Sequence, residues 1–216
     1  MSEEDDYDYL LKYIIIGESG VGKSNILLQY VNDQFFSEYQ STIGVEFAAK
    51  KIIIGEKRFR IQIWDTAGQE CYKSITRGYY NNSVCALIVY DISDKKTFQK
   101  VSSWIEDCKV HAPKTISLIL IGNKSDLENR EVTYEEGQKL ANENGIKFYE
   151  SSAKTGQNIG AIFSDSANDI AKKIDEGYYH IETDSCGIKK GSSKKNTKIK
   201  KQNSKKNNNK EKKKCC

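Results

Sequence analysis

The sequence predicts a three-layer α/β domain, with a six-stranded, mostly parallel sheet containing one antiparallel strand and flanked by about five helices. Three observations predict it. Short apolar, β-branched runs alternate with helical patterns, a glycine-rich loop joins the first run to the first helical pattern, and a two-residue turn signal separates the second and third runs. With 216 residues and 38% hydrophobic side chains, the chain is long enough for one such domain and a tail.

The predicted strands are short runs rich in β-branched and aromatic residues. They cover residues 12–16, 44–54, 57–64, 84–90, 116–121 and 147–150. Gly55-Glu56 joins the second run to the third, and a connection of two residues makes those strands antiparallel. The other strands are separated by helices, which predicts parallel pairing with right-handed crossovers.

Helical periodicity predicts helices over residues 23–32, 72–80, 95–110, 134–144 and 159–175. Thr133 and Glu136 have the spacing of a capping box, which marks the start of the fourth helix. The last helix has an apolar face suited to packing on a sheet, made of Ile159, Ile162, Phe163, Ala167, Ile170, Ala171 and Ile174.

Polar loops leave the carboxyl ends of several predicted strands. They follow Ile16, Trp64, Ile121 and Glu150. Sheets of this class bind ligands outside the carboxyl ends of their strands. We therefore expect one pocket to collect these loops.

Charge is divided sharply along the chain. The net charge is +4, but residues 187–216 contain 13 lysines and one glutamate, so this segment carries +12 and the preceding 186 residues carry −8. Nucleic-acid-binding domains carry their positive charge on a folded face, so no nucleic-acid partner is expected. The profile predicts an acidic N-terminal extension (1–9), a folded domain (10–176) and a basic tail (177–216), disordered over 187–214.

Nothing in the sequence resembles a secretory signal or a membrane span, because the first residues are acidic and the apolar runs are strand-sized. Six cysteines without a signal peptide suggest free thiols in a reducing compartment. Cys85 lies inside an apolar run and is expected to be a small core residue.

Residues 17–24 read Gly-Glu-Ser-Gly-Val-Gly-Lys-Ser, a complete G-x-x-x-x-G-K-S phosphate loop between a strand-like run and a helix-like stretch. Its glycines let backbone N–H groups point at phosphate oxygens, and the start of the helix adds a positive dipole end. Lys23 is expected to reach the β- and γ-phosphates, and the Ser24 hydroxyl to ligate Mg²⁺. The alternative is a plain glycine-rich turn, which the flanking strand and helix disfavour.

The third predicted strand is followed by Asp65-Thr66-Ala67-Gly68-Gln69. An Asp at this place in a P-loop protein holds Mg²⁺, and a glycine leaves its N–H free to approach a γ-phosphate. The Gln69 amide has a donor and an acceptor, so it can orient an attacking water. A surface turn would look the same by itself, and the phosphate loop upstream is what favours the metal and catalytic interpretation.

Asn123-Lys124-Ser125-Asp126 follows the fifth predicted strand. A carboxylate can accept two hydrogen bonds from an edge that guanine has and adenine lacks, so Asp126 is the expected guanine reader and Asn123 the clamp on its loop. An exposed polar turn is the other interpretation, because these residue types dominate turns. Residues 151–154, after the last strand, are expected to supply a backbone N–H to the guanine carbonyl.

A polar loop over residues 37–44 follows the first predicted helix. Thr42 in this loop offers a second hydroxyl to Mg²⁺. Phe35 at its edge has two interpretations that the sequence leaves open, stacking on a base or packing at the end of the helix.

These motifs occur in the order and spacing of the Ras-like small GTPases, which the chain resembles over roughly residues 8–190. The motifs are residues 17–24, Thr42, 64–70, 123–126 and 152–154. Further stretches resemble the Rab family, namely residues 43–47, 74–80 and the terminal Cys215-Cys216. The stretches that look closest to the Rab subgroup acting between endoplasmic reticulum and Golgi are 12–17, 122–130 and 181–191.

The resemblance implies a P-loop GTPase domain that switches between GTP and GDP forms with Mg²⁺ as cofactor. It implies slow GTP hydrolysis, with Gln69 positioning the water, and an activating protein that supplies a missing cation. The implied metal-binding residues are Ser24, Thr42 and Asp65. The implied nucleotide-binding residues are Ser19, Gly20, Val21, Gly22, Lys23, Ser24, Asn25, Phe35, Thr42, Gly68, Asn123, Lys124, Asp126, Ser152, Ala153 and Lys154.

Partners are also implied: an exchange factor, a GTPase-activating protein, a GDP-dissociation inhibitor and effectors that act in vesicle transport. Thr42 and Gly68 would hold two switch segments, about 36–47 and 65–80, onto the γ-phosphate. The implied effector-binding residues are Ile43, Phe47, Trp64 and Tyr79. The expected location is the cytoplasmic face of intracellular membranes, Golgi or ER–Golgi intermediate, with a cytosolic pool.

The terminal Cys215 and Cys216 have no surroundings that predict packing. A disulfide between them is disfavoured because a reducing compartment keeps thiols free. A metal site is disfavoured because two cysteines are too few ligands. The Rab resemblance implies prenylation of both, and stable anchoring takes two such signals. Nuclear localisation stays an alternative for the lysine-rich tail, because short basic tracts look alike.

The sequence disfavours two other classes of function. A nucleotide-binding scaffold without hydrolysis is disfavoured by the intact Asp65, Gly68 and Gln69. A P-loop ATPase or small-molecule kinase is disfavoured by residues 123–126 and by the lack of an arginine-rich lid. The chain departs from the family pattern at Ser19, at Cys71 and at residues 81–83.

Overall fold

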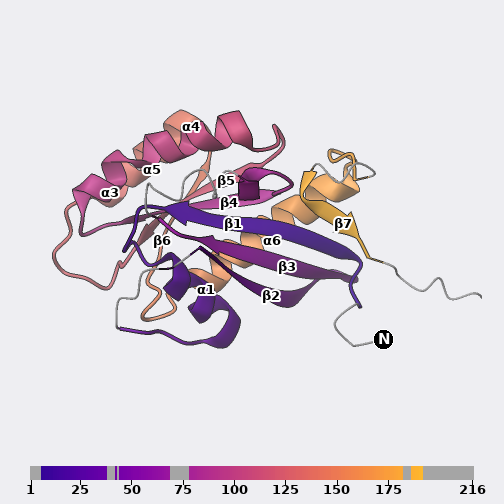
Figure 1. Cartoon of the computed structure of the whole chain (residues 1–216), viewed down its shortest axis with the longest axis horizontal. Helices are drawn as coiled ribbons and strands as arrows, with labels where there is room; N and C mark the ends of the chain where they lie inside the picture. Colours follow the sequence, from indigo (N-terminus) through magenta and orange to yellow (C-terminus); the bar gives the residue numbers. More distant parts are fainter. Residues whose placement is uncertain (1–5, 38–41, 43, 69–77, 182–185, 192–216) are drawn as a thin grey trace, which may run out of the picture.

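The computed structural model describes residues 6–37, 42, 44–68, 78–181 and 186–191. These residues form three layers, with helices on both faces of a central sheet (Figure 1). The predicted three-layer architecture is confirmed.

The sheet order is β2-β3-β1-β4-β5-β6, and every neighbouring pair on this path is parallel except β2 and β3. The strands are β1 (Tyr9–Gly17), β2 (Val45–Ile54), β3 (Lys57–Thr66), β4 (Cys85–Asp91), β5 (Ser117–Asn123) and β6 (Lys147–Glu150). Gly55 turns the chain between β2 and β3 with a φ of 59°, a left-handed conformation in which glycine is unstrained. The predicted antiparallel hairpin is therefore confirmed.

The helices are α1 (Lys23–Asn32), α3 (Lys95–Gln99), α4 (Val101–His111), α5 (Tyr134–Asn144) and α6 (Ile159–Asp175). The single helix predicted over 95–110 is wrong, because the N–H of Lys100 bonds to the carbonyl of Phe98 and interrupts the regular pattern. The predicted capping box of Thr133 and Glu136 is present. Of the helix predicted over 72–80, only residues 78–80 are described, and they are helical.

Side chains of β1 alternate between the two faces of the sheet and so join two cores. Tyr13 and Ile15 pack in the core under α1 and α6, whereas Ile14 and Ile16 pack in the core under α4 and α5. Both cores are fully buried along this strand, as expected for a parallel sheet covered on both faces. Cys85 is buried in the first of these cores, as predicted.

A seventh strand, β7 (Ile188–Lys190), was not predicted. It pairs antiparallel with residues Tyr9–Leu11, the part of β1 that precedes the pairing with β4. Ile188 is fully buried, and the Lys12 N–H donates to the Gly187 carbonyl at 2.9 Å. The expected disorder from residue 187 onward is therefore wrong at its start, because β7 satisfies backbone groups that β4 does not reach.

Within the described ranges, no helix combines the length and the apolar character that a bilayer crossing requires.

Candidate functional site

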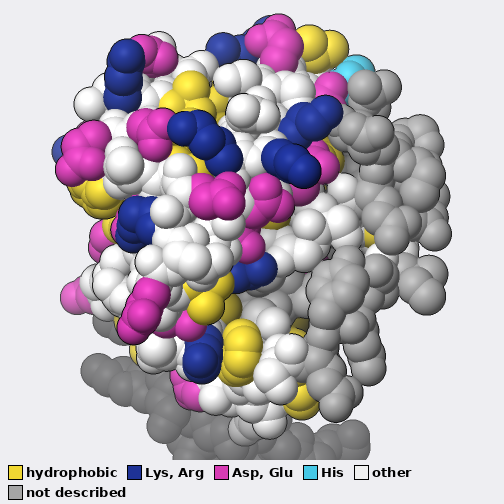
Figure 2. Space-filling model, turned by 90° about the vertical axis from the view of Figure 1, so that its left-hand side faces the viewer, with side chains coloured by type: hydrophobic (Ala, Val, Ile, Leu, Met, Phe, Trp, Pro, Cys, Tyr) yellow, Lys and Arg dark blue, Asp and Glu magenta, His cyan; other side chains and the backbone are white. Residues whose placement is uncertain are grey.

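The predicted site loops lie at one end of the sheet. Because β1, β3, β4, β5 and β6 run parallel, their carboxyl ends meet at the left-hand edge of Figure 1. Figure 2 looks onto this edge and shows acidic and basic side chains intermingled over its described part. The topology thus brings the predicted loops to one edge of the sheet, and the single pocket expected to collect them stays a prediction.

The phosphate loop connects β1 to α1 through glycines that have no room for a side chain. Gly17 has a φ of 142°, and a Cβ there would lie 2.2 Å from the Val89 carbonyl oxygen. Gly22 has a φ of 96°, and a Cβ there would lie 2.4 Å from Nδ2 of Asn123. Tight packing and left-handed backbone at both positions explain the sequence requirement for glycine.

Lys23 opens α1 and points back over the loop, where its side chain is buried. Its Nζ donates to the carbonyl oxygens of Gly17 at 3.0 Å and Glu18 at 2.7 Å. Burial lowers the pKa of Lys23 to about 8, while the Asp65 and Glu18 carboxylates oppose the shift. A phosphate beside this ammonium would favour its charged form.

The three predicted metal-binding side chains lie together. The Ser24 Oγ donates to Oδ2 of Asp65 at 2.5 Å and lies 2.9 Å from Oγ1 of Thr42. Three separate elements meet here, because Ser24 lies in the first turn of α1, Asp65 lies near the end of β3 and Thr42 precedes β2. Burial raises the pKa of Asp65 to about 6, while the hydrogen bond from Ser24 and the charge of Lys23 oppose the rise.

The same oxygens fit a magnesium ion. Oδ1 of Asp65 is buried and accepts no hydrogen bond from any described residue. Two hydroxyls and one carboxylate are hard oxygen ligands of the type Mg²⁺ prefers, and phosphates usually complete such sites. An ion held by Ser24 and Thr42, with Asp65 behind them, would neutralise charge on phosphate oxygens.

Gly68 touches the phosphate loop. A Cβ at this position would lie 2.5 Å from the backbone N of Ser19 and 2.5 Å from Nζ of Lys23. The backbone of residue 68 therefore approaches the amino group expected to hold the terminal phosphates.

Asn123 at the end of β5 links three loops. Its Nδ2 donates to the carbonyl oxygen of Val21 at 2.9 Å, and its Oδ1 accepts from the N–H of Ala153 and the hydroxyl of Ser151, each at 3.2 Å. The side chain is almost fully buried. These contacts are those of a clamp that holds the phosphate loop against the loops after β5 and β6.

Asp126 is held from the neighbouring loop. The Ser152 hydroxyl donates to its Oδ1 at 2.6 Å, and Lys154 Nζ lies 3.9 Å from its Oδ2. Lys124 lies beside it in sequence but pairs with Asp91 at the end of β4, at 2.6 Å. The carboxylate expected to read guanine is thus pre-oriented by its neighbours.

Residues 151–154 use most of their N–H groups inside the protein. Ser151 N–H donates to Gly122, Ser152 N–H to Gln157 and Ala153 N–H to Asn123. In the described part of the chain, the Lys154 N–H has no such acceptor. A base carbonyl would therefore meet the Lys154 N–H, or else displace the 3.2 Å bond that Ala153 makes to Asn123.

Asn25 organises the segment that follows α1. Its side-chain amide exchanges two hydrogen bonds of 3.0 Å with the backbone N–H and carbonyl of Phe36. Phe35, next to this contact, is 38% exposed, which does not support packing in the core at the helix end. Its ring is available to stack on a base, which was the other interpretation.

The predicted effector-binding residues that the structure describes form one aromatic cluster. Phe47 and Trp64 are cross-strand partners with ring centroids 4.9 Å apart, and Tyr79 lies 5.1 Å from Trp64. Lys12 from β1 places its Nζ over both the Trp64 and Tyr79 rings, and burial lowers the pKa of this lysine. Phe47 is 47% exposed, so the cluster has a face open to a partner.

Two site contacts were missed from the sequence. Trp104 on α4 donates from Nε1 to Oε1 of Glu18 in the phosphate loop at 3.0 Å, and no sequence signal connects positions so far apart. Asp91, the partner of Lys124, had a signal: it directly follows the predicted strand 84–90, whose carboxyl end points to the same edge.

Several predicted residues lie outside the described part of the chain. These are Ile43, Gln69, Cys215 and Cys216. Gly20 lies in the described phosphate loop with a φ of 80°. The roles expected of all these residues stay predictions.

Comparison with known protein families gives one match. A family model described as Ras family matches residues 12–172, about three quarters of the chain. The matched span runs from β1 to the C-terminal part of α6 and includes every described residue of the site above.

Proposed function

The chain belongs to the Ras family of small GTPases, and from this premise we propose that it is a Rab-type, membrane-anchored switch in vesicle transport between endoplasmic reticulum and Golgi. Membership implies binding of GTP and GDP, typically with Mg²⁺, and hydrolysis of GTP. Family membership alone does not imply the Rab subgroup, the membrane on which the protein acts or its dependence on an activating protein. These three properties are what we propose.

One observation supports the switch most directly. Thr42, from the loop before β2, lies 2.9 Å from Ser24, and Gly68, from the loop after β3, lies against Lys23. Both loops therefore meet the phosphate loop where the γ-phosphate and its ion would sit. Loss of that phosphate on hydrolysis would remove what these loops bind and release them.

The aromatic cluster couples this change to a partner surface. Phe47 follows Thr42 along the chain, and Trp64 directly precedes Asp65. A change at either loop would therefore move a ring of the cluster and alter a half-exposed apolar surface. Effectors that bind the GTP form are expected to read this surface.

Hydrolysis is proposed to be slow without help. Lys23 neutralises charge that develops on the phosphate, and Gln69 is proposed to orient the water. The three described arginines lie away from the phosphate loop, since Arg58 pairs with Asp8, Arg130 pairs with Glu150, and Arg60 lies opposite Leu10 near the start of β1. Unaided turnover on the order of 10⁻⁴–10⁻³ s⁻¹ is expected, with an activating protein that supplies a cation.

The test of the switch has two parts. Nucleotide released from purified protein should be guanylate, and single-turnover hydrolysis with Mg²⁺ should be slow for the wild type and accelerated by an activating protein. A Gln69→Leu variant should lose that acceleration. Adenylate in the purified protein, or full acceleration of the Gln69→Leu variant, would contradict the proposal.

The anchor is tested separately. Wild-type protein in cells should fractionate with membranes, and a variant with Cys215→Ser and Cys216→Ser should move to the cytosolic fraction. Co-localisation with Golgi and ER–Golgi markers tests the route. Equal partitioning of both forms would refute anchoring by these cysteines, and nuclear accumulation would favour the alternative for the basic tail.

A further inference from the structure

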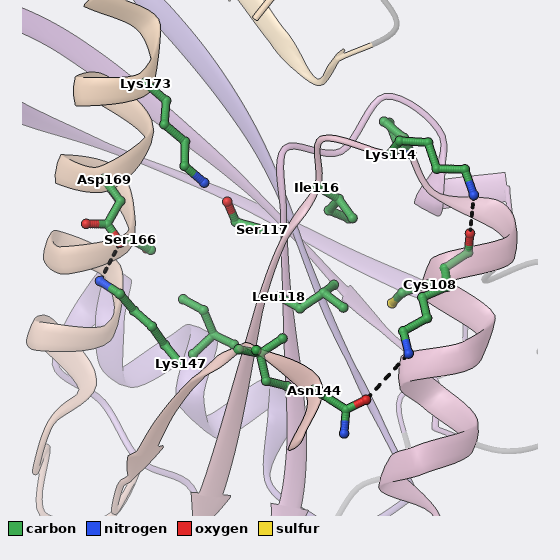
Figure 3. Close-up of a pocket in the computed structure, with 15 residues that line it drawn as sticks. Cys108, Lys114, Ile116, Ser117, Leu118, Asn144, Lys147, Ser166, Asp169 and Lys173 are labelled. Carbon is green, nitrogen blue, oxygen red and sulfur yellow. Dashed lines mark hydrogen bonds and ion pairs between the residues drawn. The ribbon is translucent and has the colours of Figure 1, made fainter. Parts of the chain in front are cut away.

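A cavity of about 460 Å³ lies at the end of the sheet opposite to the phosphate loop. It opens between α4 and α6, where β5 begins at Ser117 and β6 begins at Lys147 (Figure 3). None of the contacts described above for the nucleotide site involves it. Its size is in the range of pockets that bind small ligands.

The rim of this cavity is basic. Its charged lining residues are Lys109, Lys114, Lys147, Lys173 and Asp169. Four lysines against one aspartate leave a net charge of +3, although residues 1–186 as a whole carry −8. A positive site on an acidic body favours an anionic ligand at this place.

Most of these lysines are engaged, but one faces the cavity. Lys147 pairs with Asp169, and Lys109 donates to Oδ1 of Asn144. Lys173 packs its ammonium over the Tyr178 ring at 5.6 Å, and it has no ion pair with any described residue. In Figure 3 the Lys173 amino group points toward Ser117 across the cavity.

The back of the cavity carries a hydroxyl whose hydrogen bonding is incomplete. Ser117 Oγ and the nearby Tyr179 hydroxyl are both buried, and neither makes a hydrogen bond of good geometry within the described structure. A buried hydroxyl without a bond is costly, so an acceptor entering the cavity would be stabilised there. Ser117 and Lys173 thus offer two donors to one anionic group.

The floor is apolar. It is formed by Ile116, Leu118, Ile119 and Ile146. Figure 3 shows Ile116 and Leu118 between Lys173 of α6 and Lys114, which follows α4. A free inorganic anion would leave this floor unused, whereas an anion with a hydrocarbon part would cover it.

We propose that this cavity binds an amphiphilic anion, with its acidic group on Lys173 and Ser117 and its hydrocarbon part on the isoleucine and leucine floor. The chemistry is shared by acidic phospholipids of a bilayer and by free acyl anions. At this end of the sheet Lys190 of β7 lies opposite Tyr9, and a lysine-rich sequence follows it in the chain.

The test uses the full-length protein, unmodified and loaded with GDP, and follows backbone amide signals by NMR. The probes are dihexanoyl phosphatidic acid below its micelle concentration, dihexanoyl phosphatidylcholine and inorganic phosphate. Phosphatidic acid should shift the amides of residues 116–119 and 146–147 and bind more tightly than either control. If phosphatidylcholine binds as tightly as phosphatidic acid, the proposed role of the basic residues is overturned. If inorganic phosphate binds as tightly, the proposed role of the apolar floor is overturned.

Two neighbouring lysines of α6 provide matched variants. Lys173 lines the cavity, whereas Lys172 points to solvent and pairs with Glu176 at 3.9 Å. Lys173→Gln should weaken phosphatidic acid binding about tenfold, and Lys172→Gln should leave it within about twofold. Retained GDP and an unchanged melting temperature verify the fold of both variants. Equal effects of the two would show binding to general positive charge and overturn the site.

Vesicles containing phosphatidic acid distinguish the two sources. If bilayer lipid occupies the cavity, the vesicles should displace the soluble probe from wild-type protein. If free acyl anions are the ligand, a soluble fatty acid should displace it and the vesicles should not. Displacement by neither would overturn the proposal. Guanylate binding is measured independently, so failure here leaves the proposed switch untouched.

Discussion

The side-chain amide of Asn123 donates a 2.9 Å hydrogen bond to the carbonyl oxygen of Val21, 102 positions earlier in the chain. Through this bond the loop expected to read the base holds the loop expected to hold the phosphates. Oδ1 of the same residue accepts bonds from Ser151 and Ala153, so one buried side chain couples three loops. Nucleotide affinity should therefore depend on Asn123 even where it does not touch the nucleotide.

Replacing Asn123 by Ala should loosen the nucleotide. The substitution removes the clamp and leaves the Val21 carbonyl and the Ala153 N–H without their partner. We expect release of fluorescent GDP to become about 10- to 100-fold faster, the range for losing one or two buried hydrogen bonds. Asn168→Ala on the exposed face of α6 is the control, and its release rate should match the wild type. Release from Asn123→Ala within twofold of the control would contradict the clamp.

Gly68→Ala should impair the GTP form selectively. The added methyl would lie 2.5 Å from both Ser19 N and Lys23 Nζ, so residue 68 or the phosphate loop has to move. We expect the Kd for a non-hydrolysable GTP analogue to rise about tenfold or more, whereas GDP, which lacks the γ-phosphate, should lose little. Gly78→Ala is the control, because no atom lies within 4 Å of a Cβ there. Parallel losses for both nucleotides would show a general disturbance of the loop.

Ser24→Ala should weaken magnesium binding. Ser24 Oγ lies between Thr42 and Asp65, and its loss removes one hard ligand and breaks the link between the other two. Removal of Mg²⁺ with a chelator should speed GDP release from the wild type. In the variant, GDP release should already be fast. The Mg²⁺ concentration at which the slowing of GDP release is half complete should rise about tenfold. An unchanged Mg²⁺ requirement would place the ion elsewhere.

The central residues of this site could be predicted from the sequence because they lie in short motifs, each within a few residues of a predicted strand end. The phosphate loop, Asp65 with Gly68, and Asn123 with Asp126 each follow a strand end within a few residues, and parallel topology then brings them together. The strand and helix patterns predicted the parallel pairing and the one hairpin without any knowledge of the site.

The missed features depend on contacts between distant positions. Trp104 and Glu18 meet only because α4 packs beside β1, and neither residue type suggests the other. β7 was missed because its two lysines resemble the tail that follows, and only Ile188 reaches the core. The break at Lys100 lies inside a continuous helical pattern, where a single changed hydrogen bond leaves no sequence signal.

Loss of the β7 contact should destabilise the domain. Ile188 is fully buried in the core under α1 and α6, so Ile188→Ala should lower the free energy of unfolding by about 2–4 kcal/mol. Lys190→Ala, on the exposed end of the same strand, is the control and should change it by less than about 0.5 kcal/mol. Denaturant unfolding with saturating GDP measures both. Equal stability of the two variants would mean that β7 does not contribute to the folded domain.

The buried thiol of Cys108 should be unreactive in the folded protein. Burial in the core under α4 raises its pKa to about 12, and the neighbouring Asp107 carboxylate adds to the rise. The thiolate, not the thiol, reacts with iodoacetamide, so at pH 8 mass spectrometry should find Cys108 unmodified in native protein and modified after unfolding. Rapid native-state modification would contradict the burial.

The same shift predicts a loss of stability in alkali. The folded pKa of Cys108 lies above the ordinary thiol value of 9.0, so the folded state favours the neutral thiol. The stability that the neutral Cys108 thiol contributes is fully present below pH 9. It is lost as the pH rises toward 12, where the thiol ionises in both the folded and the unfolded state. Cys108 alone should cost about 1 kcal/mol by pH 10. Unfolding curves at pH 8 and pH 10 should show a smaller fall for Cys108→Ala than for the wild type, because alanine has no proton to lose. An identical fall would assign the alkaline loss to other groups, such as the buried Tyr30, whose pKa burial also raises to about 12.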